Sequence, residues 1–466
     1  MTQQKKSKST RRVPRNQSAR GHALDILIAI EEQSAYSNLM LNQAFQKLQL
    51  EQQDKALVTE LVYGTIQRQN TLDHFLTPFV KKGLHKLDRW VHLLLRMSVY
   101  QMAYMDRIPA HAVVNESVTI AKQRAHQGIS GMVNGVLRSM LRTADAFTVR
   151  EGQNAIETMS LQHAHPVWMM EQWVKQYGEE TAARIAASNQ LPPAASLRVN
   201  EMKMKRTELI DILQEQGYTV RPSLVHPSGV VVERGGNLAA HPLFQEGCFS
   251  IQDESSMVVA EAVAPEPGMT VLDCCAAPGG KSSHMAEKMK DQGQLIANDL
   301  HPHKQKLIQQ QADRLGLQSI EAKVSDAAQI DQVYESGQFD RILLDAPCSG
   351  LGVIRRKPDL KWNKQAEEMA QLPALQLQLL EAAAALLKPD GRLVYSTCTI
   401  VEQENEGVVQ SFLDKHPEYT WDEQMVERLP ESIQTLVQED APGRVQILPY
   451  HFQSDGFFIA SLRRTC

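Results

Sequence analysis

Two cysteines in the C-terminal half of the sequence stand where covalent chemistry could occur. Cys348 comes three residues after Asp345, and Cys398 follows a separate apolar run. A thiolate is a strong nucleophile, but a thiol with an ordinary pKa of about 8.5 needs a cationic neighbour to ionise near neutral pH. Lys281 is a candidate for that neighbour. Two thiols expected beside carboxylates and an amine predict nucleophilic catalysis rather than a structural role.

The segment that contains Lys281 has the composition of a ligand-binding turn. Residues 271–282 read as a strand, a turn of small residues and the start of a helix. Ligands of open α/β sheets bind at such strand ends, where helix N–H groups point outward. Cys275 stands where a P-loop needs glycine, and the glycine pattern of a dinucleotide site is missing, so neither site is predicted. The turn residues expected to line the site are Cys275, Ala276, Ala277, Pro278, Gly279, Gly280 and Lys281.

Acidic residues close the next three expected strands. Asp299, Asp326 and Asp345 each end an apolar run. A single strand-end Asp could equally cap the following helix. Three in successive strands, all at one edge of a sheet, favour a binding crevice. Because a carboxylate at such a position can accept both hydroxyls of a ribose, Asp299 predicts a nucleoside-containing ligand.

These residues must be positioned by an α/β sheet that begins near Gly268. Apolar residues at consecutive positions, as at 342–344 in the run 341–344, are typical of a parallel strand covered on both faces. Alternation of such runs with helical segments predicts a parallel α/β fold. The expected strands are 270–274, 295–299, 320–325, 339–345 and 392–397, and the expected helices are 280–289, 302–315 and 373–387.

The N-terminal part of the chain has helical periodicity. Between residue 19 and about residue 142, apolar residues recur at spacings of three and four, which predicts an all-α domain. A small α+β module is expected next, with a helix at 168–187, a strand at 196–200, a helix at 207–216 and a strand at 230–233. The expected domains are a basic arm at 1–19, a helical domain at 20–145, the middle module at 146–245 and the α/β domain at 246–466.

The formal net charge of −5 hides an uneven distribution. The first twenty residues carry seven Lys and Arg and no acid, which leaves −12 for the rest of the chain. This arm lacks apolar periodicity and is expected to be unfolded, serving either as a solubilising end or to attract phosphates. Arg184, Arg198 and Arg221 of the middle module could line a nucleic-acid surface, although isolated arginines on a folded domain are more often solvated.

Composition excludes several classes of protein. A chain of 466 residues, 42% hydrophobic and 22% charged, is typical of a globular protein with two or three domains. Six cysteines are too few for a disulfide framework, and their spacing fits no paired zinc motif. No apolar run approaches the roughly 20 residues of a membrane span. We therefore expect a cytoplasmic protein with free thiols, no metal site and no membrane partner.

The chemical segments together resemble the motifs of RNA cytosine-5 methyltransferases that use S-adenosylmethionine. The resemblance rests on 273–281, 345–350 and 396–399 and extends over 249–463. It implies a Rossmann-like methyltransferase domain in which Cys398 attacks carbon 6 of cytosine and Cys348 assists product release. DNA enzymes use the Pro-Cys thiol as nucleophile, so swapped roles are the alternative. Asp345 would hydrogen-bond the cytosine ring, with Lys281 steadying the site.

The same resemblance assigns the cofactor contacts. The turn from Cys275 to Lys281 would cradle the methionine part of S-adenosylmethionine. Asp299 would bind the ribose hydroxyls and Asp326 the adenine amino group, with Asp345 near enough to contact the cofactor as well.

The helical domain looks like the NusB family. The segments that carry this likeness are 60–64, 108–111 and 134–138. A NusB-like domain joined to such a catalytic domain is similar to the bacterial enzymes that form 5-methylcytosine in 16S ribosomal RNA, acting on free RNA or an assembling small subunit. That resemblance implies a monomeric enzyme whose helical and middle modules hold the RNA. Two alternatives stay open: an RNA-binding or antitermination protein with a vestigial methyltransferase fold, and an enzyme that acts on transfer RNA.

Overall fold

The computed structural model describes residues 18–33, 35–150, 152, 154–364 and 366–465. The chain divides into two compact units, residues 1–186 with 357–363, and residues 187–356 with 364–466. The basic arm expected at 1–19 lies, up to residue 17, outside the described residues. Among the residues described, no helix is long and apolar enough to cross a membrane.

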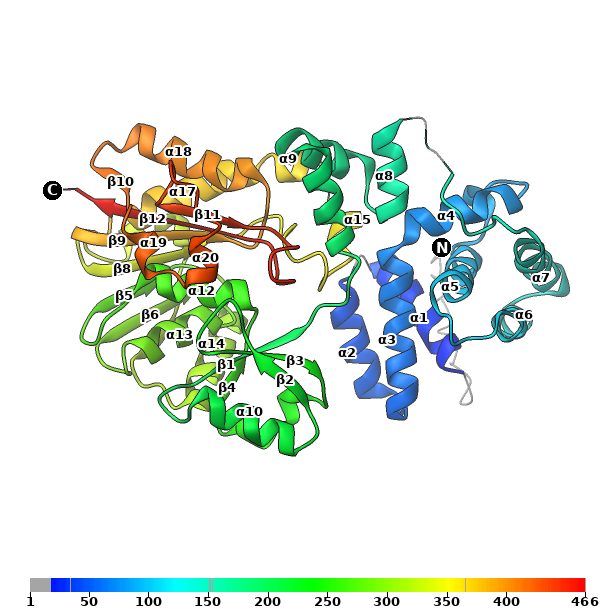
Figure 1. Ribbon diagram of the computed structural model, residues 1–466, viewed down its shortest axis with the longest axis horizontal. Helices are drawn as coiled ribbons and strands as arrows, with labels where there is room; N and C mark the ends of the chain where they lie inside the picture. The colour runs from blue at the N-terminus through cyan, green and yellow to red at the C-terminus, as the bar shows by residue number, and fades with distance from the viewer. Residues whose placement is uncertain (1–17, 34, 151, 153, 365, 466) are drawn as a thin grey trace, which may run out of the picture. The chain divides into compact units, whose positions relative to one another are not determined.

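The first unit is helical, as the apolar spacing predicts (Figure 1). Its core includes Leu24, Leu61, Leu94 and Leu137, which are fully buried and come from four different helices. The long helix α9 is interrupted at Gly178, whose φ of 79° is outside the helical region. The helices are α1 (Ala19–Gln33), α2 (Ser37–Lys47), α3 (Gln52–Gln67), α4 (Gln69–Leu76), α5 (Arg89–Tyr104), α6 (Ala110–Arg124), α7 (Gln127–Arg142), α8 (Ala155–His163) and α9 (Val167–Ser188), with the 3-10 turns η1 (Thr77–Phe79) and η2 (Leu84–Lys86).

A segment from much later in the sequence completes this helical unit. Residues 357–363, which include the short helix α15 (Leu360–Asn363), pack here and are called the inserted segment below. Asp359 Oδ2 accepts hydrogen bonds from the backbone N–H and the hydroxyl of Ser37, at 3.2 and 2.6 Å. The indole N–H of Trp362 donates to the carbonyl of Ile66 at 2.6 Å. Periodicity reports only on local structure, so the sequence analysis did not anticipate this insertion.

The second unit begins with a small antiparallel sheet in the order β2-β3-β1-β4. Its core includes Leu197, Leu209, Val230 and Phe249. The strands near 196–200 and 230–233 and the helix near 207–216 were predicted. The strands β2 and β4 were missed because their sequences, TVRP and FSI, are short and mix apolar with polar residues. The elements are β1 (Ala195–Val199), α10 (Arg206–Glu215), β2 (Thr219–Pro222), β3 (Gly229–Arg234), η3 (Leu238–Ala240), α11 (Pro242–Gln245) and β4 (Phe249–Ile251).

The large sheet of this unit has the order β10-β12-β9-β8-β5-β6-β7, with β11 paired to β12. The strands β5 to β9 are parallel, as predicted, but β12 runs antiparallel to β9, β10 and β11. The strands at the C-terminal edge, β10 to β12, were not among the expected ones, and their pairing makes the sheet mixed. The strands are β5 (Thr270–Asp273), β6 (Gln294–Asp299), β7 (Ile320–Val324), β8 (Phe339–Asp345), β9 (Leu387–Thr397), β10 (Tyr419–Trp421), β11 (Arg444–Ile447) and β12 (Phe457–Arg464).

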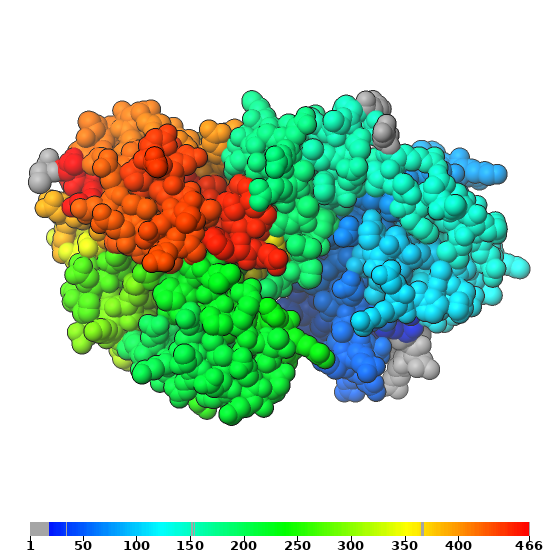
Figure 2. Space-filling model, in the orientation of Figure 1, coloured from blue at the N-terminus to red at the C-terminus, as the bar shows by residue number. Residues whose placement is uncertain are grey.

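Helices cover both faces of the large sheet, which explains its continuous apolar strands. Leu343 belongs to the core cluster under α12, α13 and α14, whereas its neighbour Leu344 belongs to the cluster under α17 and α18. The small sheet and the α12 to α14 layer, both green, share one continuous surface (Figure 2). The helices are α12 (Glu254–Val263), α13 (Gly280–Lys288), α14 (Pro302–Leu315), η4 (Ala327–Gln332), α16 (Ala366–Met369), α17 (Leu372–Ala384), η5 (Glu402–Glu404), α18 (Glu406–Lys415), α19 (Met425–Arg428) and α20 (Glu431–Gln434).

Candidate active site

The strand order places a crevice at the carboxyl ends of β5 and β8. From β5 the chain moves outward to β6 and β7, and from β8 it moves outward in the other direction to β9. In open α/β sheets, ligands bind where the strand order reverses in this way. The turn at 274–281 follows β5, Cys348 lies in the loop after β8, and Cys398 directly follows β9. The topology therefore carries all three chemical segments to one edge of the sheet.

Cys348 and Cys398 are in contact at this edge. Their Sγ atoms lie 3.4 Å apart, and both side chains are partly buried. The hydrogen bond with Cys398, together with burial, raises the pKa of the Cys348 thiol well above its ordinary value. Cys348 therefore keeps its proton at neutral pH.

A lysine and a carboxylate form an ion pair at the same edge. Lys281 Nζ lies 2.7 Å from Asp345 Oδ2, and the hydroxyl of Ser396 donates to Asp345 Oδ1 at 2.8 Å. Burial alone would lower the pKa of Lys281, but the adjacent carboxylate outweighs burial and the pKa is raised. Lys281 therefore stays charged, and its Nζ also lies 5.0 Å from the centroid of the Phe457 ring.

The loop that carries Cys348 is held by two residues that the sequence analysis missed. Gln376, on α17, donates to the carbonyl of Pro347 at 2.9 Å. Glu404, in η5, accepts the backbone N–H of Ser349 at 2.7 Å and the amide of Gln376 at 3.2 Å. Neither residue lies in a recognisable motif, so no local signal could have identified them. Together they fix the backbone on both sides of the thiol.

Two glycines bring the loop after β8 against the residues that follow β9 and those that precede β12. The N–H of Gly352 donates to the carbonyl of Cys398 at 3.0 Å, and the N–H of Gly456 donates to the carbonyl of Gly352 at 2.8 Å. A Cβ atom at Gly352 would lie 2.0 Å from the Gly456 carbonyl oxygen. Since no such contact is possible, residue 352 must be glycine for the loops to approach this closely.

An arginine fixes the end of the same loop. Arg356 Nε lies 2.8 and 3.0 Å from the two carboxylate oxygens of Asp455, and its Nη2 lies 2.7 Å from Asp253 Oδ2. Asp253 also caps α12, accepting the N–H of Ser255 at 3.0 Å. The loop after β8 is thus anchored at its start, its middle and its end.

The turn after β5 leaves open space beside the sheet edge. Gly279 has a φ of 101°, and its N–H donates to the carbonyl of Ala276 at 2.7 Å, which closes the turn. A Cβ atom at Gly280, the first residue of α13, would meet no atom within 4 Å. Asp299 lies beside this turn, accepting the N–H of Ala277 at 3.4 Å through Oδ2. A polar ligand could therefore lie against the turn and reach Asp299.

The remaining predicted residues have more local contacts. Asp326 is exposed and caps η4, accepting the N–H of Ala328 at 2.9 Å through Oδ1, so one of its oxygens serves the helix. Cys275 is partly buried, and burial raises its pKa well above the ordinary value, so it lines the turn as a neutral thiol. Asp273 was not singled out from the sequence. Its carboxyl is buried against the Ser282 hydroxyl at 2.6 Å, and burial raises its pKa to about 7.

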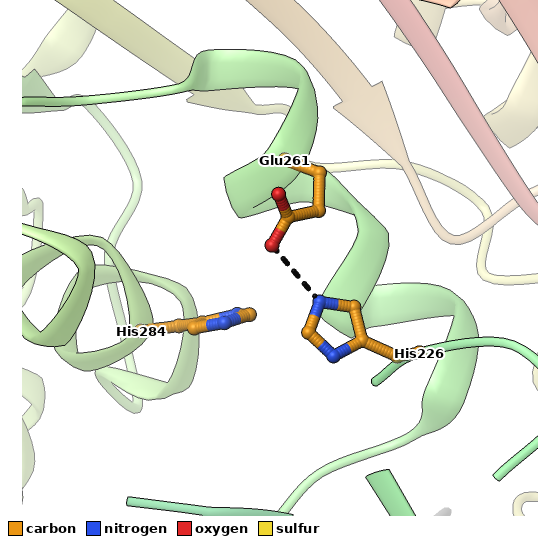
Figure 3. A group of neighbouring side chains, drawn as sticks. All are labelled: His226, Glu261 and His284. Carbon is orange, nitrogen blue, oxygen red and sulfur yellow. Dashed lines mark hydrogen bonds and ion pairs between the residues drawn. The ribbon is translucent and has the colours of Figure 1, made fainter. Parts of the chain in front are cut away.

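A group of three possible metal ligands lies away from the cysteines. The ligand atoms of His226, Glu261 and His284 lie within 4.8 Å of one another (Figure 3). The N–H of Ser228 donates to Nδ1 of His226, which places the histidine proton on Nε2, facing Glu261 at 3.1 Å. Lys288 Nζ lies 2.7 Å from each oxygen of Glu261. The carboxylate of Glu261 is therefore already bound by an ammonium group and an imidazole N–H. These contacts form a hydrogen-bonded ion cluster.

Known proteins resemble this chain over almost its whole length. Family models match it as the NusB family over residues 17–142, an RsmF/B-like ferredoxin-like domain over 165–239 and the 16S rRNA methyltransferase RsmB/F over 260–463. The probable ribosomal RNA small subunit methyltransferase B of Bacillus subtilis is 46% identical over 448 residues, which are 96% of this chain and 99% of the relative. The corresponding protein of Synechocystis is 36% identical, with the same coverage of both chains.

Solved structures agree with this assignment. The crystal structure of PH0851 superposes with a TM-score of 0.78 at 27% identity, covering 96% of this chain and 99% of that chain. A methyltransferase homologue from Pyrococcus horikoshii superposes with a TM-score of 0.57 at 28% identity, covering 67% of this chain and all of that chain. Sequence, domain order and fold lead to the same conclusion: the chain belongs to the family of the ribosomal RNA small subunit methyltransferases B.

Proposed function

We propose that this protein transfers a methyl group from S-adenosylmethionine to carbon 5 of a cytosine in 16S ribosomal RNA. The observation that carries the proposal is the contact between Cys348 and Cys398, 3.4 Å apart at the sheet edge that also holds Lys281 and Asp345. The names of the relatives, which are ribosomal RNA small subunit methyltransferases, support an RNA substrate. The pair of thiols supports chemistry at a carbon atom of the base.

The residues around the β5 turn fit a nucleoside cofactor with an amino-acid tail. The open space at Gly280 and the N–H groups at the start of α13 would receive the tail. Asp299 would accept the ribose hydroxyls, and the second oxygen of Asp326 would accept the adenine amino group. When bound, S-adenosylmethionine supplies an electrophilic methyl group.

Cys398 is the nucleophile in this proposal. Carbon 5 of cytosine is too electron-poor to take a methyl group directly, so a thiolate must first add to carbon 6, which makes carbon 5 nucleophilic. The resemblance to RNA cytosine-5 methyltransferases assigns the nucleophile to Cys398, and the raised pKa of Cys348, which keeps that thiol protonated, fits the other role. The charge on Cys398 also contributes to the raised pKa of Lys281, so the ammonium of Lys281 in turn stabilises the thiolate.

Asp345 and Cys348 take the two remaining roles. Asp345 would hydrogen-bond the cytosine ring and favour protonation of nitrogen 3 as the thiolate adds. Lys281 and Ser396 hold its two oxygens in place. After methyl transfer, a base such as water takes the proton on carbon 5, the electron pair re-forms the double bond between carbons 5 and 6, and Cys398 leaves carbon 6 as a thiolate. The thiol of Cys348 lies close enough to donate a hydrogen bond to that leaving thiolate.

The RNA would be held outside the catalytic crevice. A base must leave its stack to reach a pocket at a sheet edge. We assign the surrounding RNA to the helical domain at 20–145 and the middle module at 146–245, which would bind it by shape and phosphate contacts. The enzyme would act as a monomer in the cytoplasm, on free RNA or on an assembling small subunit.

Two measurements test the function. Calorimetry should show binding of S-adenosylmethionine to the purified protein. Bisulfite sequencing of RNA from cells that lack the protein should show one cytosine of 16S ribosomal RNA that has lost its methyl group. Absence of cofactor binding would favour an RNA-binding protein with a vestigial site, and loss of methylation in transfer RNA instead would move the substrate to that RNA.

A further inference from the structure

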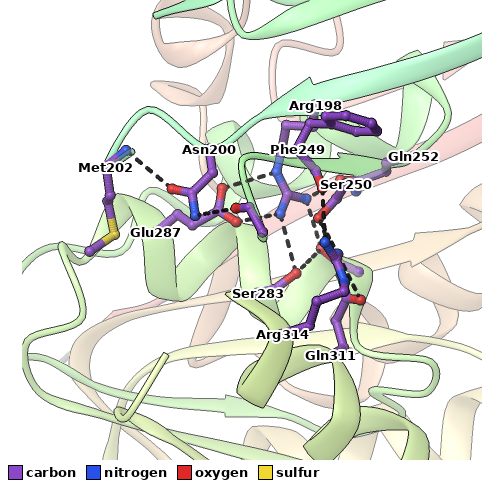
Figure 4. Close-up of polar contacts among 12 residues, drawn as sticks. Arg198, Asn200, Met202, Phe249, Ser250, Gln252, Ser283, Glu287, Gln311 and Arg314 are labelled. Carbon is purple, nitrogen blue, oxygen red and sulfur yellow. Dashed lines mark hydrogen bonds and ion pairs between the residues drawn. The ribbon is translucent and has the colours of Figure 1, made fainter. Parts of the chain in front are cut away.

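An arginine of the small sheet is buried against the methyltransferase fold. Arg198, in β1, is 1% exposed, so it cannot contribute to the RNA surface considered for it in the sequence analysis. Its Nε and Nη2 atoms bind the two carboxylate oxygens of Glu287 at 3.1 and 2.8 Å (Figure 4). Such a two-point ion pair is geometrically specific, because the planar guanidinium matches the carboxylate in only a few orientations.

The same guanidinium reaches the first turn of α13. Nη1 donates to the carbonyl of Gly280 at 2.9 Å and to Gln252 Oε1, and Nη2 donates to the hydroxyl of Ser283 at 3.2 Å. Ser283 in turn donates to the carbonyl of Gly280 at 3.1 Å. Because Glu287 lies near the end of α13 and Gly280 at its start, Arg198 holds both ends of this nine-residue helix.

The first turn of α13 is shared between this anchor and the candidate active site. Gly280 presents open space where the turn would receive the cofactor, and the next residue, Lys281, forms the ion pair with Asp345. A shift or rotation of α13 would therefore displace the cofactor turn and the active-site ammonium together. A displacement of only about 1 Å at a reacting site can lower the rate about 100-fold.

A second contact ties the end of α13 to the same module. His226 lies in the connection between β2 and β3 and faces Glu261 of α12 (Figure 3). Glu261 in turn binds Lys288 of α13. This cluster contacts α13 eight residues after Gly280. The module therefore meets α13 at its start through Arg198 and near its end through both Arg198 and the cluster around Glu261.

We infer that Arg198 is a positioning residue for cofactor binding, which extends the role of the middle module from RNA contact to shaping the catalytic turn. This inference rests on the proposed function, since it concerns the same S-adenosylmethionine site. The guanidinium of Arg198 sets the orientation of the first turn of α13 through its contacts with Gly280, Ser283 and Glu287.

The test compares four variants by calorimetry with S-adenosylmethionine and by steady-state kinetics. Arg198→Gln should weaken cofactor binding about tenfold or more, as expected for the loss of charge-assisted hydrogen bonds. The KM for S-adenosylmethionine should rise by a similar factor, whereas the KM for RNA should not change. Arg198→Lys keeps a charge for Glu287 but lacks the fork that also reaches Gly280, so it should recover binding only in part.

In Arg198→Gln, the carboxylate of Glu287 is left buried without a partner, which could itself destabilise the fold. The double variant Arg198→Gln with Glu287→Gln removes that charge, so it tests the positioning role even if Arg198→Gln alone does not fold. Cofactor binding should stay weak in the double variant. Hydrogen exchange of residues 276–285 in the cofactor-free protein should be faster in Arg198→Gln and in the double variant than in the wild type, which reports the loosened turn without any ligand.

Arg314→Gln is the matched control. Arg314, on α14, joins the same small sheet through the carbonyls of Phe244 and Phe249, at 2.6 and 3.0 Å. It also donates to Ser250 and Gln311, and none of these four hydrogen bonds reaches α13 (Figure 4). It should leave cofactor affinity within about twofold of the wild type. Equal weakening by Arg314→Gln, or wild-type affinity in either the Arg198→Gln or the double variant, would overturn the inference while leaving the function intact. A wild-type protein that does not bind the cofactor would overturn both.

Discussion

The Sγ atoms of Cys348 and Cys398 lie 3.4 Å apart, each just beyond the carboxyl end of one of two adjacent parallel strands. The register of β8 against β9 sets this distance, since Asp345 is paired with Ser396 and each cysteine follows a few residues later. Two thiols in contact can take different roles in one reaction, one as the nucleophile and the other as the group that assists release of the product. Hydrogen bonding to Cys398 and burial raise the pKa of Cys348, so this thiol keeps its proton at neutral pH.

Replacing each cysteine should give a different defect. Cys398→Ala should abolish methyl transfer, because no thiolate remains to add to carbon 6. Cys348→Ala should permit addition and methyl transfer but slow release, so a covalent complex accumulates. Denaturing gel electrophoresis after incubation with RNA and S-adenosylmethionine distinguishes the two. An adduct with Cys398→Ala and none with Cys348→Ala would reverse the roles, whereas Cys248→Ala, in the small-sheet region, should behave as the wild type.

Removing the ammonium at the active site should reduce the rate strongly. Lys281→Met leaves Asp345 without its counter-charge and the thiolate of Cys398 less stabilised, so kcat should fall about 100-fold or more. Lys388→Met is a matched control. Lys388 of β9 pairs with Asp340 of β8 at 2.8 Å, at the ends of these strands opposite to the cysteines. Its loss should leave kcat within about twofold of the wild type, as expected for a half-exposed ion pair. Equal effects of the two substitutions would contradict an active-site role for Lys281.

The close approach of Gly352 and Gly456 should not tolerate a methyl group. Gly352→Ala would push the two loops apart, which we expect to cost about 1 to 3 kcal/mol of unfolding free energy and most of the activity. Urea denaturation and a methyl-transfer assay measure the two effects. Gly131→Ala is the control, because a Cβ there meets no atom within 4 Å on the exposed side of α7. That change should stabilise the protein slightly, by about 0.5 to 1 kcal/mol.

Asp273 should make stability depend on pH. Burial raises its pKa from 3.8 to about 7 in the folded protein, so the folded state binds the proton more tightly than the unfolded state. The resulting stabilisation is fully present below pH 4 and is lost as the pH rises through 7, amounting to at most about 4 kcal/mol. Asp273→Asn should therefore flatten the decline in unfolding free energy between pH 5 and pH 8. An unchanged decline in the variant would show that Asp273 ionises normally.

The parallel part of the sheet was predictable because consecutive apolar residues in its strands indicate burial on both faces. In β8, Leu343 and Leu344 are both apolar because helices cover both faces, and the strand-end Asp345 follows from the same pattern. The direction of β12 could not be predicted in this way. Strand direction is set by the connections, and the residues of β12 are as apolar as those of a parallel strand.

The candidate site likewise contains residues that the sequence predicts and residues that it does not. Cys348, Cys398, Lys281 and Asp345 stand in segments whose residue types and order indicate their chemistry, and the structure brings them together. Residues that hold those groups in place lack such a signal. Arg198 could be a surface arginine by its sequence, and only its burial and its contact with Glu287 reveal another role. Gln376 and Glu404 acquire theirs from the loops that surround them.

The inserted segment has a consequence for how such proteins could be assembled from parts. Because residues 357–363 complete the helical unit, the chain passes from one unit to the other three times, and no single cut separates them. A protein that began at residue 187 would lack Ser37 and Ile66, so Asp359 and Trp362 would lose the groups that bind them. A version of this chain without its helical part would therefore need other residues at 357–363, where Asp359 and Trp362 have their partners in that part.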